Sequence, residues 1–305
     1  MKKQVLILAF TIVGLVFGAV AQAHAEGLVA VTTQNQLVTF DSATPGTIAT
    51  NVTITNLAAN EVIVGIDRRA ANGQLYGISN QNRVYLINLS TGQATLSSTL
   101  NMNIAGSGFG VDFNPVPDRM RVISNTGQSL RINVDTGVTL MDTSIAFGSG
   151  DPNQGQNPNV TGVAYTNSVA GATQTTLFGI DADRGILVRI GGPNGVPSPN
   201  DGLLTTIGSL GVTSELVGFE ISGLTGIAYA ALNSGGGFSQ LFTIDLLTGQ
   251  ASLVGFIGNG LLIRGLTAAP SAVPEPATML LLGTGLAGVA ARIRKRRRAT
   301  RVETA

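Results

Sequence analysis

Short apolar runs separated by polar turns recur along the chain from about residue 27 to residue 270. The runs are rich in β-branched and aromatic residues, and Gly, Asn, Asp or Thr-Gly interrupts them. Clear examples are residues 37–40, 84–87, 187–190 and 241–244. No convincing 3.6-residue apolar period runs through this region, so the pattern predicts strands joined by tight turns and an all-β body.

The strands are organised in a longer repeat. Its segments align on five glycines, spaced 45, 52, 56 and 47 residues apart: Gly65, Gly110, Gly162, Gly218 and Gly265. A second strand follows most of these segments, and a third strand then leads into a Thr-Gly turn and a fourth strand. Four strands in about 45–55 residues is the period of a β-propeller blade.

The two ends of the repeat region complement each other. The last aligned strand, 262–267, has no further strands after it, and the stretch 28–55 has later strands without an innermost one. Together they make one blade, so the sequence predicts five four-stranded blades closed by pairing between N- and C-terminal strands. The alternatives are an open solenoid and a β-sandwich whose periodicity is accidental.

The composition excludes several kinds of chemistry. The chain has no cysteine, and its one histidine, His24, lies in a predicted signal peptide. This removes Ser-His-Asp and Cys-His catalysis and His/Cys zinc sites from the mature body. Residues 26–271 hold nine arginines, no lysine and fifteen acids, a net charge of −6 that argues against nucleic-acid binding.

Carboxylates are the remaining candidates for chemistry. Asp67, Asp112 and Glu220 each stand two residues after an aligned glycine, and Ala164 and Thr267 hold that place in the other two repeats. Equivalent residues should point the same way relative to the ring axis. Three acids there could bind Ca²⁺, or two could act as a glycosidase pair.

An architectural role for the same acids is the other hypothesis. Each acid would then bond the next turn or pair with a neighbouring arginine, Arg68, Arg69 or Arg121. A second possible calcium position is Asp181 with Asp183, in a D-x-D-x-G sequence that lacks the glutamate of an EF-hand loop. A turn between two strands accounts for those residues equally well.

The N-terminus reads as an export signal. Lys2 and Lys3 precede an uninterrupted apolar run over 5–20, and the small residues Ala23 and Ala25 follow it. This predicts a secretory signal peptide over residues 1–25, with Glu26 as the first mature residue. The predicted body then covers 26–271, and 272–305 form a separate tail.

The tail has three parts in a fixed order. An uncharged apolar segment over 277–291 would span roughly 22 Å as a helix, short of the roughly 30 Å hydrocarbon core, so it predicts a marginal membrane anchor. The basic cluster after it should stay cytoplasmic and leave the body outside. The motif residues before the segment are Val273, Pro274, Glu275 and Pro276, and the basic residues after it are Arg292, Arg294, Lys295, Arg296, Arg297 and Arg298.

These three parts together resemble the PEP-CTERM sorting signal of Gram-negative bacteria. The resemblance implies recognition by the membrane enzyme exosortase, cleavage near the Pro-Glu-Pro and a transient stage in the inner membrane. It further implies a final place at the cell surface or outside the cell, in organisms with exopolysaccharide and biofilm systems.

The body also resembles a family. Residues 65–78, 110–115, 118–122, 125–128 and 161–167 are similar to the bacterial domain-of-unknown-function family 4394, and the resemblance extends over 27–270. It implies no activity and no functional residues.

We therefore expect an exported, non-catalytic surface or extracellular-matrix protein that binds polysaccharide or an envelope partner and needs no cofactor. One alternative is a secreted carbohydrate-active enzyme with a carboxylate pair. The absence of tryptophan and an aromatic content of 5% weaken that alternative, because sugars usually stack on aromatic faces. The other alternative is a calcium-dependent adhesin.

Overall fold

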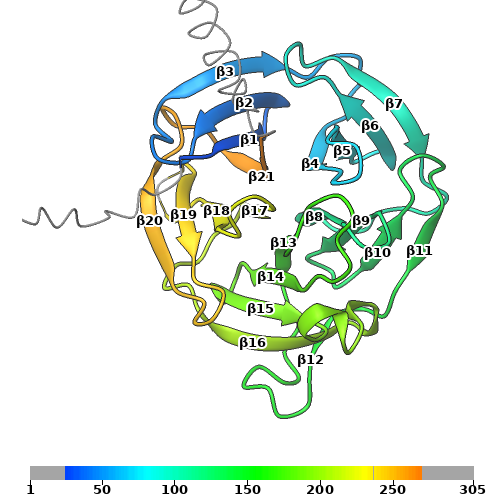
Figure 1. The fold of residues 1–305 in the computed structure, drawn as a ribbon, viewed down its shortest axis with the longest axis vertical. Helices are drawn as coiled ribbons and strands as arrows, with labels where there is room; N and C mark the ends of the chain where they lie inside the picture. Colours follow the sequence, from blue (N-terminus) through cyan, green and yellow to red (C-terminus); the bar gives the residue numbers. More distant parts are fainter. Residues whose placement is uncertain (1–24, 236, 270–305) are drawn as a thin grey trace, which may run out of the picture.

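The computed structural model describes residues 25–235 and 237–269, which form a ring of five β-sheets around a central axis (Figure 1). The sheets are antiparallel and predominantly four-stranded, and the innermost strands of neighbouring blades pack against one another around the axis. The predicted five-bladed propeller is confirmed.

The blades follow one another along the chain. Blade 1 comprises, from the axis outward, β21 (Ile263–Ala268), β1 (Gly27–Thr32), β2 (Gln36–Asp41) and β3 (Ile48–Thr53). Blade 2 comprises β4 (Ile63–Arg68), β5 (Leu75–Ser79), β6 (Arg83–Ile87) and β7 (Ala94–Thr99). Blade 3 comprises β8 (Phe109–Asn114), β9 (Arg119–Ser124), β10 (Ser129–Ile132) and β11 (Thr139–Met141).

The last two blades differ in detail. Blade 4 comprises β13 (Val160–Tyr165), β14 (Leu177–Asp181), β15 (Ile186–Ile190) and β16 (Leu203–Ser209), with β12 (Ala146–Phe147) added in parallel outside. Two 3₁₀ turns, η1 (Pro193–Gly195) and η2 (Pro199–Asp201), precede β16. Blade 5 comprises β17 (Val217–Ile221), β18 (Ala228–Leu232), β19 (Gln240–Ile244) and β20 (Ala251–Phe256).

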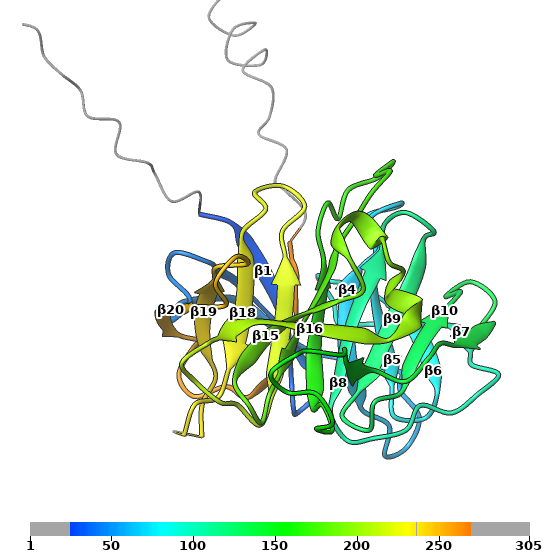
Figure 2. The same cartoon turned by 90° about the horizontal axis from the view of Figure 1, so that it is seen from below.

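The ring closes as the sequence predicted. β21 pairs antiparallel with β1, with Leu28 opposite Ala268 and Val31 opposite Gly265. Glu26 and Ala269, close to the two ends of the described chain, therefore lie at the same end of the central channel, which we call the upper mouth (Figure 2). All five innermost strands run from the opposite end, the lower mouth, toward the upper one.

The core is divided into five apolar clusters, one between each pair of adjacent blades. Strand side chains alternate between the two faces of each sheet, so a blade buries one row of side chains against each neighbour. The Thr-Gly turns also take part. Gly137, for example, adopts φ of +76°, and an added Cβ there would lie 2.1 Å from the Thr99 carbonyl oxygen of the preceding blade.

The five aligned glycines allow the innermost strands to approach closely. A Cβ on Gly110 would lie 2.7 Å from the backbone nitrogen of Val163 in the next blade, and one on Gly65 would lie 2.3 Å from Val111 Cγ2. The free space at this level of the axis is about 10 Å³. The channel is therefore filled by packed strands at its middle and opens only at its two mouths.

Candidate functional site

The residues two places after the aligned glycines form a chain of contacts between blades. Asp67 Oδ2 accepts a hydrogen bond from the backbone nitrogen of Phe113 at 2.7 Å. Asp112 Oδ2 accepts one from the backbone nitrogen of Tyr165 at 3.1 Å. In each case the donor stands one residue after the equivalent position of the next blade, so each carboxyl group joins two blades.

One further blade continues this pattern. The Thr267 hydroxyl oxygen accepts a hydrogen bond from the backbone nitrogen of Arg68 at 3.3 Å. The Ala268 backbone acts on Glu220 in the same sense, since it lowers the pKa of that carboxyl group. Ala164, at the fifth position, has no side-chain oxygen to offer. The contacts support the architectural hypothesis for the acids, with a backbone amide of the next blade as partner in place of an arginine.

Burial sets the protonation of these acids. Burial raises the pKa of Asp67 to about 6. Burial first, and then the charges of Asp67 and Glu220, raise the pKa of Asp112 well above its usual 3.8. Burial and the charge of Asp67 raise the pKa of Glu220 well above its usual 4.5. Desolvation disfavours the charged form of a carboxyl group, and neighbouring negative charges add to that effect.

Asp67 and Asp112 are electrostatically linked, since the negative charge of Asp67 raises the pKa of Asp112. Asp67 Oδ1 already accepts from the Arg68 backbone nitrogen at 2.6 Å and from the Thr267 hydroxyl at 2.7 Å. Asp112 Oδ1 is buried and accepts from no group in the described residues. A protonated oxygen needs no hydrogen-bond donor, so we place a proton on Asp112 Oδ1, in agreement with the raised pKa of this residue.

The side chains of the three arginines proposed as partners of these acids bind elsewhere. Arg68 donates to the carbonyl oxygens of Gly73 and Ala268. Arg69 Nη2 lies 2.5 Å from Asp118 Oδ2 and Arg69 Nη1 lies 2.8 Å from Asp135 Oδ1, so Arg69 links blade 2 to blade 3. Arg121 bonds Asp142 at 2.5 Å. Sequence alone could not show this, because the partners lie far along the chain.

The proposed calcium positions hold other contacts. Asp181 is buried and accepts hydrogen bonds from the backbone nitrogens of Asn159 and Arg184, and it forms an ion pair with Arg184 at 3.0 Å. Asp183 is exposed in the same turn between β14 and β15. Among residues 25–235 and 237–269, no group of three or more His, Cys, Asp or Glu side chains is placed to hold a metal ion.

The raised pKa values predict a loss of stability as the pH increases. The folded domain holds the protons of Asp67, Asp112 and Glu220 more tightly than the unfolded chain does, so their stabilisation is complete below about pH 4 and is lost as pH rises through about 6 and beyond. We expect the melting temperature to fall by roughly 5–10 °C between about pH 5 and about pH 8. Hydrogen bonds lower the pKa of Glu61 and Asp151, so these two acids stabilise the fold more as the pH rises. They titrate below pH 5 and do not affect the comparison between pH 5 and pH 8.

Asp112→Asn tests this expectation. The amide copies the neutral acid, since its oxygen can still accept from the Tyr165 backbone nitrogen and it carries no charge. Near pH 5 the variant should have the same melting temperature as the wild type, and near pH 8 it should have a higher one, as followed by circular dichroism. Asp183→Asn removes an exposed acid and serves as the control. An unchanged pH slope in Asp112→Asn would refute the protonation of Asp112.

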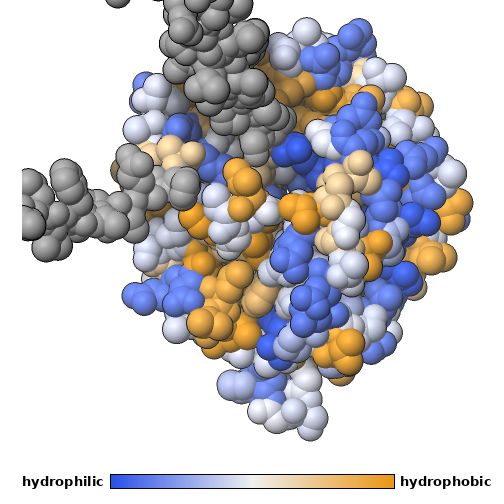
Figure 3. Space-filling model, viewed as in Figure 1, coloured by the Kyte–Doolittle hydropathy of each residue, from blue (hydrophilic) through white to orange (hydrophobic). Residues whose placement is uncertain are grey.

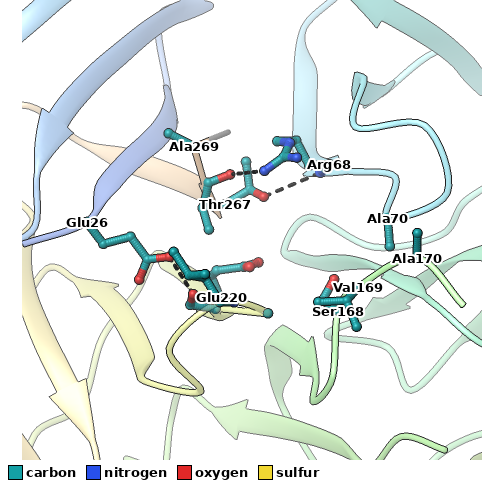
Figure 4. Close-up of a pocket in the computed structure, with 13 residues that line it drawn as sticks. Glu26, Arg68, Ala70, Ser168, Val169, Ala170, Glu220, Thr267 and Ala269 are labelled. Carbon is teal, nitrogen blue, oxygen red and sulfur yellow. Dashed lines mark hydrogen bonds between the residues drawn. The ribbon is translucent and has the colours of Figure 1, made fainter. Parts of the chain in front are cut away.

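The upper mouth holds a depression of about 310 Å³ (Figure 4). Its charged lining residues come from three blades: Arg68 at the end of β4, Glu220 in β17 and Glu26 just before β1. The loop 168–170, the loop 222–224 and residues 267–269 complete the wall. Val169 and Leu224 are 45% and 69% exposed, so the wall combines apolar side chains with charged and hydroxyl groups.

Each charged group in this depression is partly engaged. Glu26 accepts hydrogen bonds from the hydroxyls of Ser222 and Thr225, the latter at 3.0 Å. Arg68 Nε donates to the Gly73 carbonyl at 3.1 Å and Nη1 to the Ala268 carbonyl at 3.3 Å. Glu26 was not identified as a site residue from the sequence, although the predicted pairing of the two chain ends places it at a channel mouth.

The closed ring of five four-stranded sheets defines the class of the protein, a five-bladed β-propeller. The chain belongs to the family described as Domain of unknown function (DUF4394), whose profile matches residues 36–267. Residues 272–297 match the PEP-CTERM protein-sorting motif, which indicates exosortase-dependent export to the surface or exterior of a Gram-negative bacterium. No curated protein matches the sequence.

Several solved structures resemble the fold at low identity. A nidogen/laminin complex has 12% identity and a TM-score of 0.47, with 81% of this chain and 99% of that chain covered. A structural genomics protein of unknown function from Bacteroides thetaiotaomicron has 15% identity and a TM-score of 0.44, with 76% of this chain and 58% of that chain covered. A putative 6-phosphogluconolactonase from Bacteroides uniformis has 11% identity and a TM-score of 0.40, with 77% of this chain and 83% of that chain covered. None carries an argument about function.

The predicted signal peptide and the tail residues Val273 to Arg298 lie outside the described residues. Within the part of the chain that the structure describes, no helix is long and apolar enough to cross a membrane.

Proposed function

We propose that the protein is a non-catalytic, surface-displayed propeller that binds a matrix polysaccharide in the depression at its upper mouth. The depression is the observation that carries this proposal. It joins charged and hydroxyl side chains to an apolar rim, and saccharides present both hydroxyls and apolar ring faces. Hydrophobic and hydrophilic residues intermix on this face of the molecule (Figure 3).

The described acids of the ring support the non-catalytic part of the proposal. Asp67 and Asp112 are fully buried, hydrogen-bonded to the next blade and absent from the wall of the depression. A glycosidase needs two carboxyl groups that flank the substrate's scissile bond, and these two have no access to one. The proposed binding also requires no resident cofactor.

The sorting motif supports display. It begins at residue 272, three residues after Ala269, which lies on the wall of the depression. The strands and the buried core of the described residues lie within 27–268, so residues 26–271 retain the complete ring.

Ala170→Trp tests the binding site. Ala170 is an exposed loop residue on the wall, and an indole there should fill much of the depression without disturbing the core. Affinity electrophoresis of residues 26–271 in gels containing dextran, mannan or alginate should show retardation by at least one polymer. The variant should lose affinity by about tenfold or more.

Val196→Trp is the matched control, because Val196 is 76% exposed in a loop that does not line the depression. Equal retardation of both variants and the wild type would exclude the depression as the binding site. Absence of retardation by every polymer would favour a protein partner of the envelope.

A carbohydrate-active enzyme is the second candidate. Glu26 and Glu220 both line the depression, and the raised pKa of Glu220 suits a general acid. Release of reducing ends from the same polymers, abolished by Glu220→Gln, would establish this activity and overturn the non-catalytic proposal.

A further inference from the structure

The lower mouth of the channel contains a second, smaller pocket of about 120 Å³. Innermost strands or the residues just before them supply its wall, including Val64, Ser107, Phe109, Thr161, Glu215 and Arg264. It lies at the opposite end of the axis from the depression at the upper mouth, because the innermost strands begin here and end there. The two pockets are therefore separate sites.

Arg264 brings a positive charge to this pocket. Its Nη2 donates to the Thr33 carbonyl oxygen at 2.9 Å and its Nη1 to the Ile63 carbonyl oxygen at 3.3 Å. Its Nε is buried and has no hydrogen-bond partner within the described residues. No carboxylate of that part of the chain lies within 4.0 Å of the guanidinium as an ion-pair partner, although Glu215 lines the same pocket.

Arg264 differs from Arg69 and Arg121, which each pair with aspartate. It shares the lack of an ion pair with Arg68, Arg119 and Arg189 within the described residues. Arginine keeps its charge under all ordinary conditions, so burial has to be offset by hydrogen bonds or by an opposite charge. Burial lowers the pKa of Arg264 and no neighbouring acid opposes that effect.

Thr161 provides an independent observation in the same place. Its hydroxyl oxygen is buried and has no partner within the described residues, and Thr161 lines the pocket together with Arg264. A buried polar group left without a partner destabilises the folded state. Both side chains line the pocket, but Arg264 Nε and Thr161 Oγ1 each expose less than 1 Å², so a ligand oxygen reaches these two atoms only after a small movement of the side chains. A guanidinium and a hydroxyl group beside one small cavity are complementary to an acceptor that carries negative charge.

We propose that the lower mouth is a binding site for a small oxyanion, held by the Arg264 guanidinium and the Thr161 hydroxyl. The pocket, of about 120 Å³, is smaller than the sites that hold drug-sized ligands, which suits a carboxylate or phosphate group better than a complete oligosaccharide. The ligand is therefore either a free small anion or a single acidic substituent, such as the carboxylate of a uronate, that projects from a larger molecule. The site does not depend on the function proposed for the upper mouth.

Nuclear magnetic resonance of residues 26–271 labelled with ¹⁵N at arginine Nε tests the proposal. The body contains nine arginines, so the Arg264 signal can be assigned by its loss in Arg264→Gln. Titration with galacturonate or with inorganic phosphate, up to about 20 mM, should shift this signal in a saturable manner. Galactose serves as the neutral control for galacturonate, and chloride at equal ionic strength serves as the control for phosphate.

The two titrations distinguish the source of the anion. A shift with galacturonate alone indicates a uronate, and a shift with both indicates a general oxyanion site. Thr161→Val should weaken the affinity by about threefold to tenfold. Arg189→Gln, on the third strand of blade 4 and outside the pocket, should leave the affinity unchanged.

Glu215→Gln keeps the proposal testable if the variants in the pocket fold poorly. Glu215 is exposed at the rim, and removal of its charge should strengthen anion binding by about twofold to fivefold. The proposal is overturned if the Arg264 signal does not respond to either oxyanion. It is equally overturned if galactose and chloride move the signal as much as their matched anions do.

Discussion

Arg121→Ala is expected to lower the free energy of unfolding by about 3–5 kcal/mol, because it removes the centre of a buried polar network. Arg121 is 1% exposed in β9 of blade 3. It donates to Ser129 at 2.9 Å and Asp142 at 2.5 Å within its own blade. It also donates to two residues of blade 4, Tyr165 at 3.2 Å and Asn200 at 2.6 Å.

Arg131→Ala is the matched control for this variant. Arg131 pairs with the same acid, Asp142, at 2.8 Å, but its side chain is 28% exposed and contacts no residue of blade 4 through hydrogen bonds. We expect a loss of about 1 kcal/mol or less. Urea unfolding followed by circular dichroism measures both, and equal losses would contradict the role assigned to Arg121 between the blades.

Gly110→Ala should cost about 3 kcal/mol or more, because the new methyl group would meet backbone atoms that cannot turn aside. The Cβ would lie 2.7 Å from Val163 N and 2.8 Å from Gly162 C, both in the next innermost strand. Relief would require the two blades to move apart, and the closed ring opposes that movement. A melting temperature lowered by roughly 6–12 °C is the expected result.

Gly46→Ala is the control, since its Cβ would meet only the Phe256 carbonyl oxygen at an ordinary 3.7 Å. Its stability should change by no more than about 0.5 kcal/mol. If Gly110→Ala melted like Gly46→Ala, close approach of the innermost strands would not be the reason for the repeated glycine.

The repeat made most of the fold predictable. The aligned glycines, the Thr-Gly turns and the unmatched strands at the two ends predicted five blades and the pairing of β21 with β1, and the structure confirms both. This succeeded because each blade is built from local hairpins, whose turns and alternating side chains are written in consecutive residues.

The candidate sites were predictable only in part. Sequence alignment correctly identified Asp67, Asp112 and Glu220 as equivalent residues, but it left metal, catalytic and architectural roles open. Their hydrogen-bond donors stand 46 and 53 residues further along the chain for the two aspartates. Such partners are set by the rotation of one blade against the next, which no local pattern encodes.

The sequence by itself determined the all-β repeat, the five blades, the closure of the ring, the exclusion of histidine and cysteine chemistry, and the sorting motif. All of these depend on residue types at short or regular spacings. Only the tertiary structure decided that the acids are buried between blades, that Glu26 and Arg68 meet at the upper mouth, and that Arg264 and Thr161 share a pocket at the lower one. The physical reason is ring closure, which brings together residues from all five blades and removes their side chains from water, so that burial changes their charge and their choice of partners.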